Sequence, residues 1–252
     1  MKIGVIGLGL IGGSIFKDLI KLGYDVIGVS NSQSGEKIYK DYSVLKDCKL
    51  VFVCSAMNKT LEILDKLEKF LPSDTIVTDV CSLKEFVSQK ERSYIFIPSH
   101  PMAGTEHKGF ENSFEGMFQG AKWVITPLNK NEDAQQTLEN IIKQLGAEPV
   151  MTSAKEHDYA VALISHMPMV IAQAIFKTAQ DNDLALKIAA SGFRDMTRLA
   201  MSNPEMANDM VHLNSENIQT AILKLYKSVG DLTVSNYIEQ VKEIKSKRQK
   251  MF

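Results

Sequence analysis

His100 is the residue whose type and position suit acid–base chemistry. It opens the motif H-P-M-A-G-T-E, directly after an apolar run at 94–99 that predicts a strand. In open parallel sheets, the loops beyond the carboxyl ends of the strands build the ligand crevice. A histidine there, before a proline that rigidifies the loop, can exchange a proton with a hydroxyl undergoing oxidation. Taken alone, His100 could equally be a structural loop residue.

Three further polar motifs have both a chemical and a structural interpretation. D-V-C-S-L-K follows another strand-like run and contains Ser82, which could also cap a helix, with Glu85 completing a capping box. S-H-M-P, in the second half, contains His166, which alone would be read as a satisfied core histidine. S-G-F-R-D-M-T-R contains Asp195 and Arg198, whose i,i+3 spacing means that an ion pair between them could be their whole role.

A metal site is not predicted. His157, Asp158 and His166 are the only candidate cluster, but nine residues separate the histidines. No cysteine or acid cluster joins them with the spacing that zinc sites show.

A glycine-rich turn follows the first strand-like run and opens a helical stretch. Gly7 permits the tight turn, Gly9 lets the backbone approach a pyrophosphate, and Gly12 lets helix and strand pack closely. The helix N-terminus behind it supplies free N–H groups for phosphate. We therefore expect a dinucleotide to contact this turn and two later strand ends: Gly7, Leu8, Gly9, Leu10, Ile11, Gly12, Ser55 and Asp79.

The end of the second strand bears on which dinucleotide binds. An NAD site usually carries an acid here for the ribose hydroxyls. This strand instead ends in Ser30, Asn31 and Ser32, while Asp25 lies at its other end. The small polar groups leave room for a 2′-phosphate, with Lys37 as a possible counter-charge, although Ser30 could equally bind the ribose of NAD. The cofactor is thus NAD or NADP, with a slight preference for NADP.

The first 150 residues alternate short apolar runs with amphipathic helical stretches. This alternation predicts an α/β fold with a Rossmann-type, doubly wound parallel sheet. One early strand–helix unit is short. The expected strands are 2–7, 25–30, 50–55, 75–79, 94–99, 122–126 and 148–151, and the expected helices between them include 10–22, 58–70 and 133–145.

The pattern changes after Thr152, where only helical periodicity remains. Ser153 and Glu156 have the spacing of a capping box. The stretch 154–180 is apolar around most of its circumference, which suits burial in a bundle or a dimer interface. We predict a dinucleotide-binding domain at 1–152 and an all-helical substrate and dimerisation domain at 153–252.

Composition and charge indicate a soluble globular protein of the cytoplasm. The formal net charge of −1 gives no reason to expect nucleic-acid binding. Three cysteines without a C-x-x-C pair favour a reducing compartment, and Cys54 and Cys81 lie in apolar runs as inert thiols. No signal peptide is recognised, and no apolar run is judged to approach the ~20 residues that span a bilayer, so we expect no membrane association.

These motifs, in this order, resemble those of the prephenate/arogenate dehydrogenase family of tyrosine biosynthesis. G-L-G-L-I-G-G-S, D-V-C-S-L-K, H-P-M-A-G-T-E, S-H-M-P and S-G-F-R-D-M-T-R carry the resemblance from Met1 to about Asn214. It implies a Rossmann-type domain followed by a helical dimerisation domain, and a homodimer. The family oxidatively decarboxylates a cyclohexadienyl ring: C4 loses hydride to the nicotinamide while the ring loses CO2 and becomes aromatic.

The resemblance also implies roles for individual residues. His100, in its neutral form, would accept the hydrogen bond or proton of the C4 hydroxyl, and Ser82 would orient that hydroxyl. Arg198 would grip a substrate carboxylate, with Asp195 behind it as an orienting partner. Three further residues would line or shape the substrate pocket: His166, Thr105 and Glu106.

The sequence departs from the family pattern at two places that bear on substrate. One is the residue that follows the second strand, Ser30, as described above. The other comes after the arginine motif, where many relatives carry a tryptophan and this chain has Ala207; its single tryptophan is Trp123. Some arogenate-using relatives share both departures, and a carboxylate such as Glu106 could favour the ammonium of arogenate. We predict prephenate as the substrate, with an NADP-preferring arogenate dehydrogenase as the alternative.

Two other classes of function are less favoured. A β-hydroxyacid-type dehydrogenase usually places a catalytic lysine on the helical domain, and the motifs of the second half contain none. A nucleotide-binding module without catalysis would not need Ser82, His100 and Arg198 together.

Overall fold

The computed structural model describes residues 1–105, 107–128, 131–234 and 236–251. The chain divides into two compact units. The sheet unit comprises Met1–Val161 and Met201–Leu213, and the helical unit comprises Ala162–Ala200 and Asn214–Phe252. The division between residues 161 and 162 falls within the helix Ala154–Ala179. A later helix, Pro204–Leu213, belongs to the sheet unit. The domain boundary at 152 remains a prediction.

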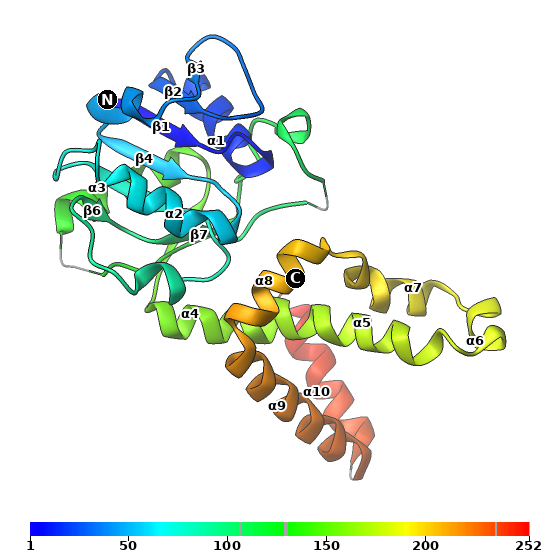
Figure 1. Ribbon diagram of the computed structural model, residues 1–252. Helices are drawn as coiled ribbons and strands as arrows, with labels where there is room; N and C mark the ends of the chain where they lie inside the picture. The colour runs from blue at the N-terminus through cyan, green and yellow to red at the C-terminus, as the bar shows by residue number, and fades with distance from the viewer. Residues whose placement is uncertain (106, 129–130, 235, 252) are drawn as a thin grey trace. The chain divides into compact units, whose positions relative to one another are not determined.

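The sheet unit is built on a six-stranded parallel sheet with the order β3-β2-β1-β4-β5-β6 (Figure 1). This is the strand order of a doubly wound dinucleotide-binding sheet, so the predicted fold class is confirmed. The strands are β1 (Lys2–Ile6), β2 (Asp25–Val29), β3 (Ile38–Tyr39), β4 (Leu50–Val53), β5 (Ile76–Asp79) and β6 (Ile95–Phe96).

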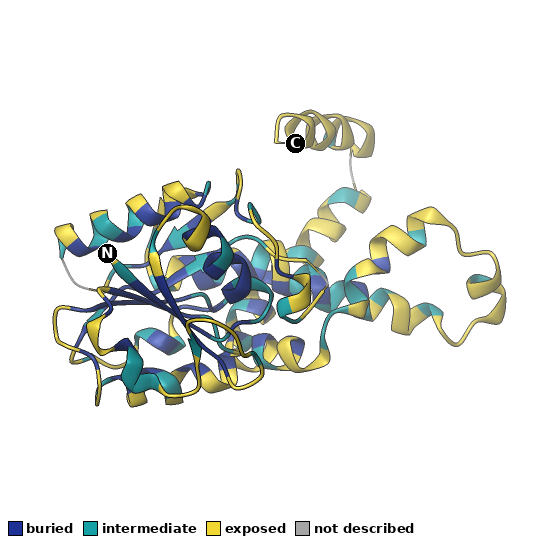
Figure 2. Cartoon of the chain, turned by 90° about the horizontal axis from the view of Figure 1, so that it is seen from above, coloured by how far each residue is buried: buried dark blue, intermediate teal, exposed yellow. Residues whose placement is uncertain are grey.

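Strand β4 shows why the sheet is apolar on both faces. Leu50 and Phe52 belong to one hydrophobic core cluster, whereas Val51 and Val53 belong to another. Successive side chains of a strand point to opposite faces, so a strand covered on both sides reads as a continuous apolar run. Helices α1 (Leu10–Lys21) and α3 (Glu132–Gln144) contribute to the first cluster and α2 (Met57–Leu67) to the second. The sheet strands are correspondingly buried in Figure 2.

The shortened early unit is also confirmed. Strand β3 has two residues, and a 3-10 helix (Tyr42–Asp47) stands where a full crossover helix would be. The carboxylate of Asp41 accepts a hydrogen bond from the Ser43 backbone N–H and so starts this turn.

The predicted single strand at 94–99 is wrong. The parallel sheet ends with β6, and Ser99–Pro101 form β7 in a separate three-stranded sheet. There β7 pairs antiparallel with β8 (Lys122–Ile125), which pairs parallel with β9 (Glu148–Met151). Pro98 has no N–H to continue the parallel ladder, so the chain changes partner there. His100 therefore lies within a short strand and not in a loop beyond one.

Residues 153–251 contain no strand among those the structure describes, as predicted. Helix α4 (Ala154–Val161), a π-helical turn (Ala162–His166) and α5 (Met167–Ala179) follow one another. The later elements are α6 (Asp183–Lys187), α7 (Ser191–Thr197), a 3-10 turn (Arg198–Met201), α8 (Pro204–Leu213), α9 (Ser215–Val234) and α10 (Tyr237–Gln249).

The predicted capping box at the start of α4 is present. The Ser153 hydroxyl accepts a hydrogen bond from the Glu156 N–H, and the Glu156 carboxylate accepts one from the Ser153 N–H, each at 3.2 Å. The Ser153 hydroxyl also donates to the Glu156 carboxylate at 2.8 Å, and this bond, with those from the Ser153 N–H and the Thr152 hydroxyl, lowers the pKa of Glu156.

The expectation that no apolar run approaches a membrane span was wrong in one respect. The helix Ala154–Ala179 has 26 residues and a mean hydropathy of 1.6, enough by length and composition to cross a bilayer. Only 28% of its most apolar window is buried within the chain. Such values are also typical of a helix that packs against another helix in a soluble protein.

Candidate functional site

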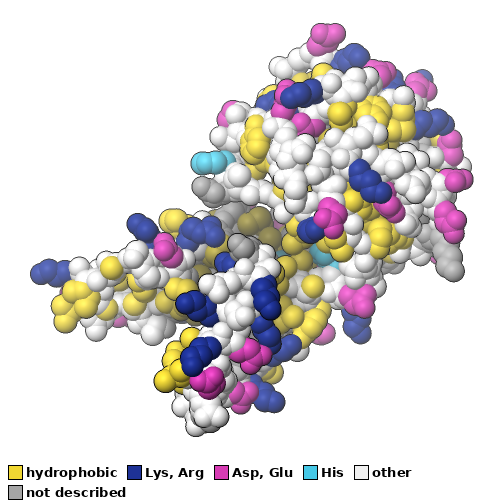
Figure 3. All heavy atoms as spheres, turned by 180° about the vertical axis from the view of Figure 1, so that it is seen from behind, with side chains coloured by type: hydrophobic (Ala, Val, Ile, Leu, Met, Phe, Trp, Pro, Cys, Tyr) yellow, Lys and Arg dark blue, Asp and Glu magenta, His cyan; other side chains and the backbone are white. Residues whose placement is uncertain are grey.

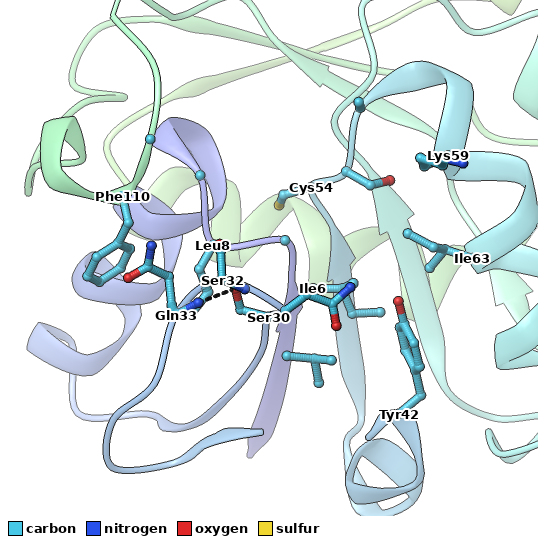
Figure 4. A pocket seen from close by; sticks show the side chains of 17 residues that line it. Ile6, Leu8, Ser30, Ser32, Gln33, Tyr42, Cys54, Lys59, Ile63 and Phe110 are labelled. Carbon is cyan, nitrogen blue, oxygen red and sulfur yellow. Dashed lines mark hydrogen bonds between the residues drawn. The ribbon is translucent and has the colours of Figure 1, made fainter. Parts of the chain in front are cut away.

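A cavity of about 360 Å³ opens at the carboxyl ends of β1, β2 and β4 (Figure 4). This edge of a doubly wound sheet is where dinucleotides bind. The residues that line it are Ile6, Gly7, Leu8, Gly9, Val29, Ser30, Asn31, Ser32, Gln33, Tyr42, Cys54, Ser55, Ala56, Lys59, Ile63, Gly109 and Phe110.

The three glycines of the turn differ in what their missing side chains allow. Gly7 has φ +82°, and a Cβ there would lie 2.6 Å from the Cys54 carbonyl oxygen. A Cβ on Gly12 would clash with the Gly7 carbonyl oxygen. A Cβ on Gly9 would meet nothing within 4 Å, so only a bound molecule would be crowded by it. Gly7 and Gly12 thus serve the fold, while Gly9 keeps the cavity open.

Helix α1 begins directly after this turn, with Gly9 as its N-cap and no side-chain cap. Its first amides are therefore suited to bind phosphate. Of the turn residues predicted to contact the cofactor, Gly7, Leu8 and Gly9 line the cavity, as does Ser55. Leu10, Ile11 and Gly12 are outside the lining and form the first turn of the helix.

The polar end of β2 contributes three of the predicted residues, Ser30, Asn31 and Ser32, to the cavity. The Ser30 hydroxyl accepts hydrogen bonds from the Ser32 and Gln33 backbone N–H groups, at 3.3 and 3.1 Å (Figure 4). These bonds hold the turn after β2 and leave the hydroxyl hydrogen as a donor.

The counter-charge expected from Lys37 is used elsewhere. Its ammonium lies 2.8 Å from Asp25, and it is outside the cavity lining. The cation that lines the described cavity is Lys59, on α2 (Figure 4). Lys59, Tyr42 and Phe110 also line the cavity. Their spacing in the sequence did not predict this, since only folding brings them to the glycine turn.

Asp79 was expected at the cofactor but is fully buried in a structural network. Its carboxylate lies 2.5 Å from the Lys84 ammonium and accepts hydrogen bonds from the Cys81 and Ser99 N–H groups. Lys84, also fully buried, donates to the Ser99 carbonyl at 2.6 Å, and the Trp123 indole donates to the Ser99 hydroxyl at 2.9 Å. The Asp79–Lys84 pair, through its bonds to Ser99, joins the loop that carries Ser82 to the strand that carries His100.

Ser82 is half-buried on that loop, and its hydroxyl contacts the Met57 sulfur at 3.4 Å. The capping box with Glu85 does not form, since the 3-10 turn begins only at Phe86. The Asp158 carboxylate, from α4, takes the capping role instead: it accepts the Lys84 N–H at 2.8 Å and the Glu85 N–H at 2.9 Å. Ser82 is thereby left available for another role.

His100 is half-buried, and its Nδ1 lies 3.0 Å from Nε2 of His157. The Nδ1 of His157 lies 2.7 Å from an Asp158 carboxylate oxygen. His157 and Asp158, two of the residues considered for a metal, thus bond to each other, and His157 also bonds to His100. Within the described chain, no group of three His, Cys, Asp or Glu side chains could hold a metal ion.

The predicted pocket residues of the H-P-M-A-G-T-E motif are only partly described. Thr105 is exposed, and its hydroxyl accepts the His107 N–H at 3.2 Å. Glu106 lies outside the described residues.

In the helical unit, His166 is buried and its Nδ1 lies 3.1 Å from the Asn214 side-chain nitrogen. Arg198 is exposed. Asp195 was expected to orient Arg198 but contacts Arg194, at 3.3 Å.

The two thiols expected to be buried and inert differ in exposure: Cys81 is buried, whereas Cys54 is half-buried and lines the cavity. Burial raises the pKa of Cys54 and of Cys81 well above that of a free thiol. A thiol that stays protonated is a poor nucleophile and a poor metal ligand.

The sheet order, the glycine turn and the cavity beyond it define a Rossmann-type, dinucleotide-binding oxidoreductase fold. Residues 30–151 match the family model described as "Prephenate dehydrogenase, nucleotide-binding domain", and residues 153–245 match "Prephenate dehydrogenase, dimerization domain". The chain belongs to the prephenate/arogenate dehydrogenase family of tyrosine biosynthesis. The first match begins at residue 30 and does not include the glycine turn. The assignment of that turn to the nucleotide site therefore rests on its geometry.

Relatives with different substrates resemble the chain to similar degrees. Prephenate dehydrogenase of Bacillus subtilis is 30% identical over 93% of this chain and 69% of its own. The structure of Synechocystis arogenate dehydrogenase is 32% identical, covers both chains completely and has a TM-score of 0.87. Prephenate dehydrogenase from A. aeolicus, in complex with hydroxyphenyl propionate and NAD+, is 28% identical over 100% and 98% of the chains, with a TM-score of 0.89.

Proposed function

We propose that this chain is a prephenate dehydrogenase, which converts prephenate to 4-hydroxyphenylpyruvate and CO2. In this reaction His100 accepts the hydrogen bond or proton of the C4 hydroxyl as that carbon becomes a carbonyl, and Ser82 orients the hydroxyl. The observation that carries the proposal is the buried Asp79–Lys84–Ser99 network, which joins the Ser82 loop to the His100 strand. Proton transfer requires that the base and the group that orients its substrate are both held in place.

The cavity at the glycine turn fits NAD+ or NADP+. The bound nucleotide supplies the hydride acceptor. Gly9 gives the pyrophosphate room, the α1 amides bind it, and Ser30, Asn31 and Ser32 meet the ribose. No carboxylate is among the described lining residues and Lys59 is, which supports a preference for NADP+. Lys59→Ala should then weaken NADP+ binding more than NAD+ binding in a fluorescence titration.

The remaining parts of the proposal concern the helical unit, the loop after β7 and the assembly. Arg198 binds a substrate carboxylate, which suits its exposed guanidinium. Thr105, Glu106 and His166 shape the same pocket. The protein is a homodimer, because the second family match is a dimerization domain. Its place is the cytoplasm, as expected from the sequence. The apolar helix 154–179 then packs in a subunit interface and spans no membrane.

Arogenate is the alternative substrate, and one observation favours it. The arogenate dehydrogenase of Synechocystis matches the whole chain at 32% identity, slightly above the two prephenate enzymes. Ala207 is buried on α8 and cannot supply an aromatic cover at the place of the tryptophan of many relatives.

A steady-state assay that crosses prephenate and arogenate with NAD+ and NADP+ tests the proposal. Prephenate with NADP+ should give the highest kcat/KM. His100→Asn should lower kcat by about a hundredfold to ten-thousandfold, the range of a lost general base, without weakening nucleotide binding. His212→Asn, an exposed histidine on α8, is the control and should change neither. A His100→Asn enzyme with near-normal kcat would refute the role of His100.

A further inference from the structure

A continuous chain of hydrogen bonds runs behind His100. It starts at the Asp158 carboxylate, crosses the His157 ring (Nδ1 to Oδ1, 2.7 Å) and ends at Nδ1 of His100 (Nε2 to Nδ1, 3.0 Å). His157 and Asp158 are 2% and 3% exposed, whereas His100 is half-buried. The two imidazole planes stand at 79°, so one nitrogen of each ring points to the other ring.

The carboxylate decides the direction of these bonds. Asp158 accepts the backbone N–H groups of Lys84 and Glu85, as an ionised carboxylate does. The proton between Asp158 and His157 therefore sits on Nδ1 of His157. Nε2 of His157 is then an acceptor, and Nδ1 of His100 must donate to it. This leaves Nε2 of His100 without a proton.

We infer that Asp158 and His157 are positioning residues that hold His100 in the tautomer able to act as a base. The inference rests on the proposed function for its kinetic consequence only. When Nε2 of His100 accepts a proton, the imidazolium lies 3.0 Å from His157, with the Asp158 anion beyond it. The other buried charges at this edge of the sheet unit, Asp79 and Lys84, neutralise each other. The Asp158 anion is thus the nearby charge that stabilises the cation.

The structural alternative is that Asp158 only caps the turn at 84–85. The two interpretations differ for Asp158→Asn. Oδ1 of Asp158 both accepts the Lys84 N–H and contacts Nδ1 of His157, whereas Oδ2 accepts the Glu85 N–H. With the Asn NH2 group in place of Oδ1, the Asn oxygen still accepts the Glu85 N–H, while the NH2 group donates to Nδ1 of His157 and reverses both bonds. His157 would then donate from Nε2, and His100 would carry its proton on Nε2, where the base is needed. A carboxylate that sets a histidine tautomer has this signature in serine proteases.

The first test is kinetic. Asp158→Asn should lower kcat by about a hundredfold or more, with KM changed less than about threefold. His157→Leu should lower it less, by about tenfold, because Nε2 of His100 is then free to be either protonated or not. The double variant should return to the level of His157→Leu, since no ring remains to carry the wrong proton. A double variant worse than Asp158→Asn, or an Asp158→Asn enzyme of normal kcat, would overturn the inference.

The second test needs no turnover and so separates this inference from the proposed reaction. In protein labelled with 15N-histidine, the His100 resonances should report the Nδ1–H tautomer in the unaltered chain and a mixture in His157→Leu. If Asp158→Asn fails to fold, His157→Leu carries the test. An unchanged His100 tautomer in His157→Leu refutes the inference even when the enzyme is active on prephenate.

Discussion

The sheet unit buries the charged residues of its D-V-C-S-L-K motif, whereas the helical unit exposes the charged residues of its arginine motif. In the sheet unit, Asp79, Lys84 and Ser99 bond to one another in the interior, and His100 is held through His157. In the helical unit, Arg198 is exposed, and the neighbouring pair of Arg194 and Asp195 lies at the surface with 79% and 71% of each side chain exposed.

The apolar residues show the same contrast. The sheet unit buries its apolar side chains in two clusters, one on each face of the sheet. The helical unit has a small cluster around Ala162, Ile218 and Ala221, while many large apolar side chains of its helices are exposed (Figure 3). The helical unit thus has apolar surface that a second copy of the chain would cover.

The largest expected effect is on assembly. Leu223 and Tyr226 lie on α9 with 69% and 79% exposure, three residues apart on one helix face. Replacing both by Glu should convert the proposed dimer to a monomer, measured by light scattering after size exclusion. Ile20→Glu, at a 50% exposed position on α1 of the sheet unit, should leave the mass unchanged. A double variant that stays dimeric would place the interface elsewhere.

The next effect is on the buried ion pair. Lys84→Met leaves the Asp79 carboxylate uncompensated in the interior, which should lower the free energy of unfolding by about 3–5 kcal/mol in urea titrations. Lys21→Met removes an exposed pair with Glu115, and its effect should be too small to measure. Equal effects in the two variants would contradict the contrast between interior and surface pairs.

Two glycines of one turn should separate folding from cofactor binding. Gly12→Ala places a methyl group against the Gly7 carbonyl and should cost about 1–3 kcal/mol of stability. Gly9→Ala meets nothing in the chain, so Tm should be unchanged while nucleotide affinity falls about tenfold or more, roughly 1.4 kcal/mol. A Gly9→Ala variant that binds nucleotide with full affinity would contradict the assignment of this turn to the cofactor site.

The smallest effect concerns the cap of α4. Ser153→Ala should cost about 1 kcal/mol at neutral pH, as lost N-caps do. The pKa of Glu156 is lowered in the folded chain, so the capping box stabilises above its ordinary value of 4.5, and this contribution is lost as pH falls through the lowered pKa. The difference in Tm between the two proteins should therefore narrow in acid. Ser191→Ala, on an uncapped helix, is the control.

Local patterns in the sequence predicted much of the fold. The alternation of apolar runs and helical stretches predicted the sheet, and the Ser153–Glu156 spacing predicted the capping box. The predicted strand at 94–99 failed because an apolar run says nothing about which sheet it joins after Pro98. The capping box at Ser82 failed because Asp158, 74 residues from Lys84, provides the cap instead.

The sequence by itself determined the residue types at the site: a glycine turn, a histidine before a proline, and an arginine motif. These are properties of short segments, in which neighbours along the chain set the geometry. Only the tertiary structure decided that Asp79 is a buried ion-pair partner, and that His157 and Asp158 stand behind His100. Such pairings depend on which strand ends and helices meet in space, and on the need of each buried polar group for a partner.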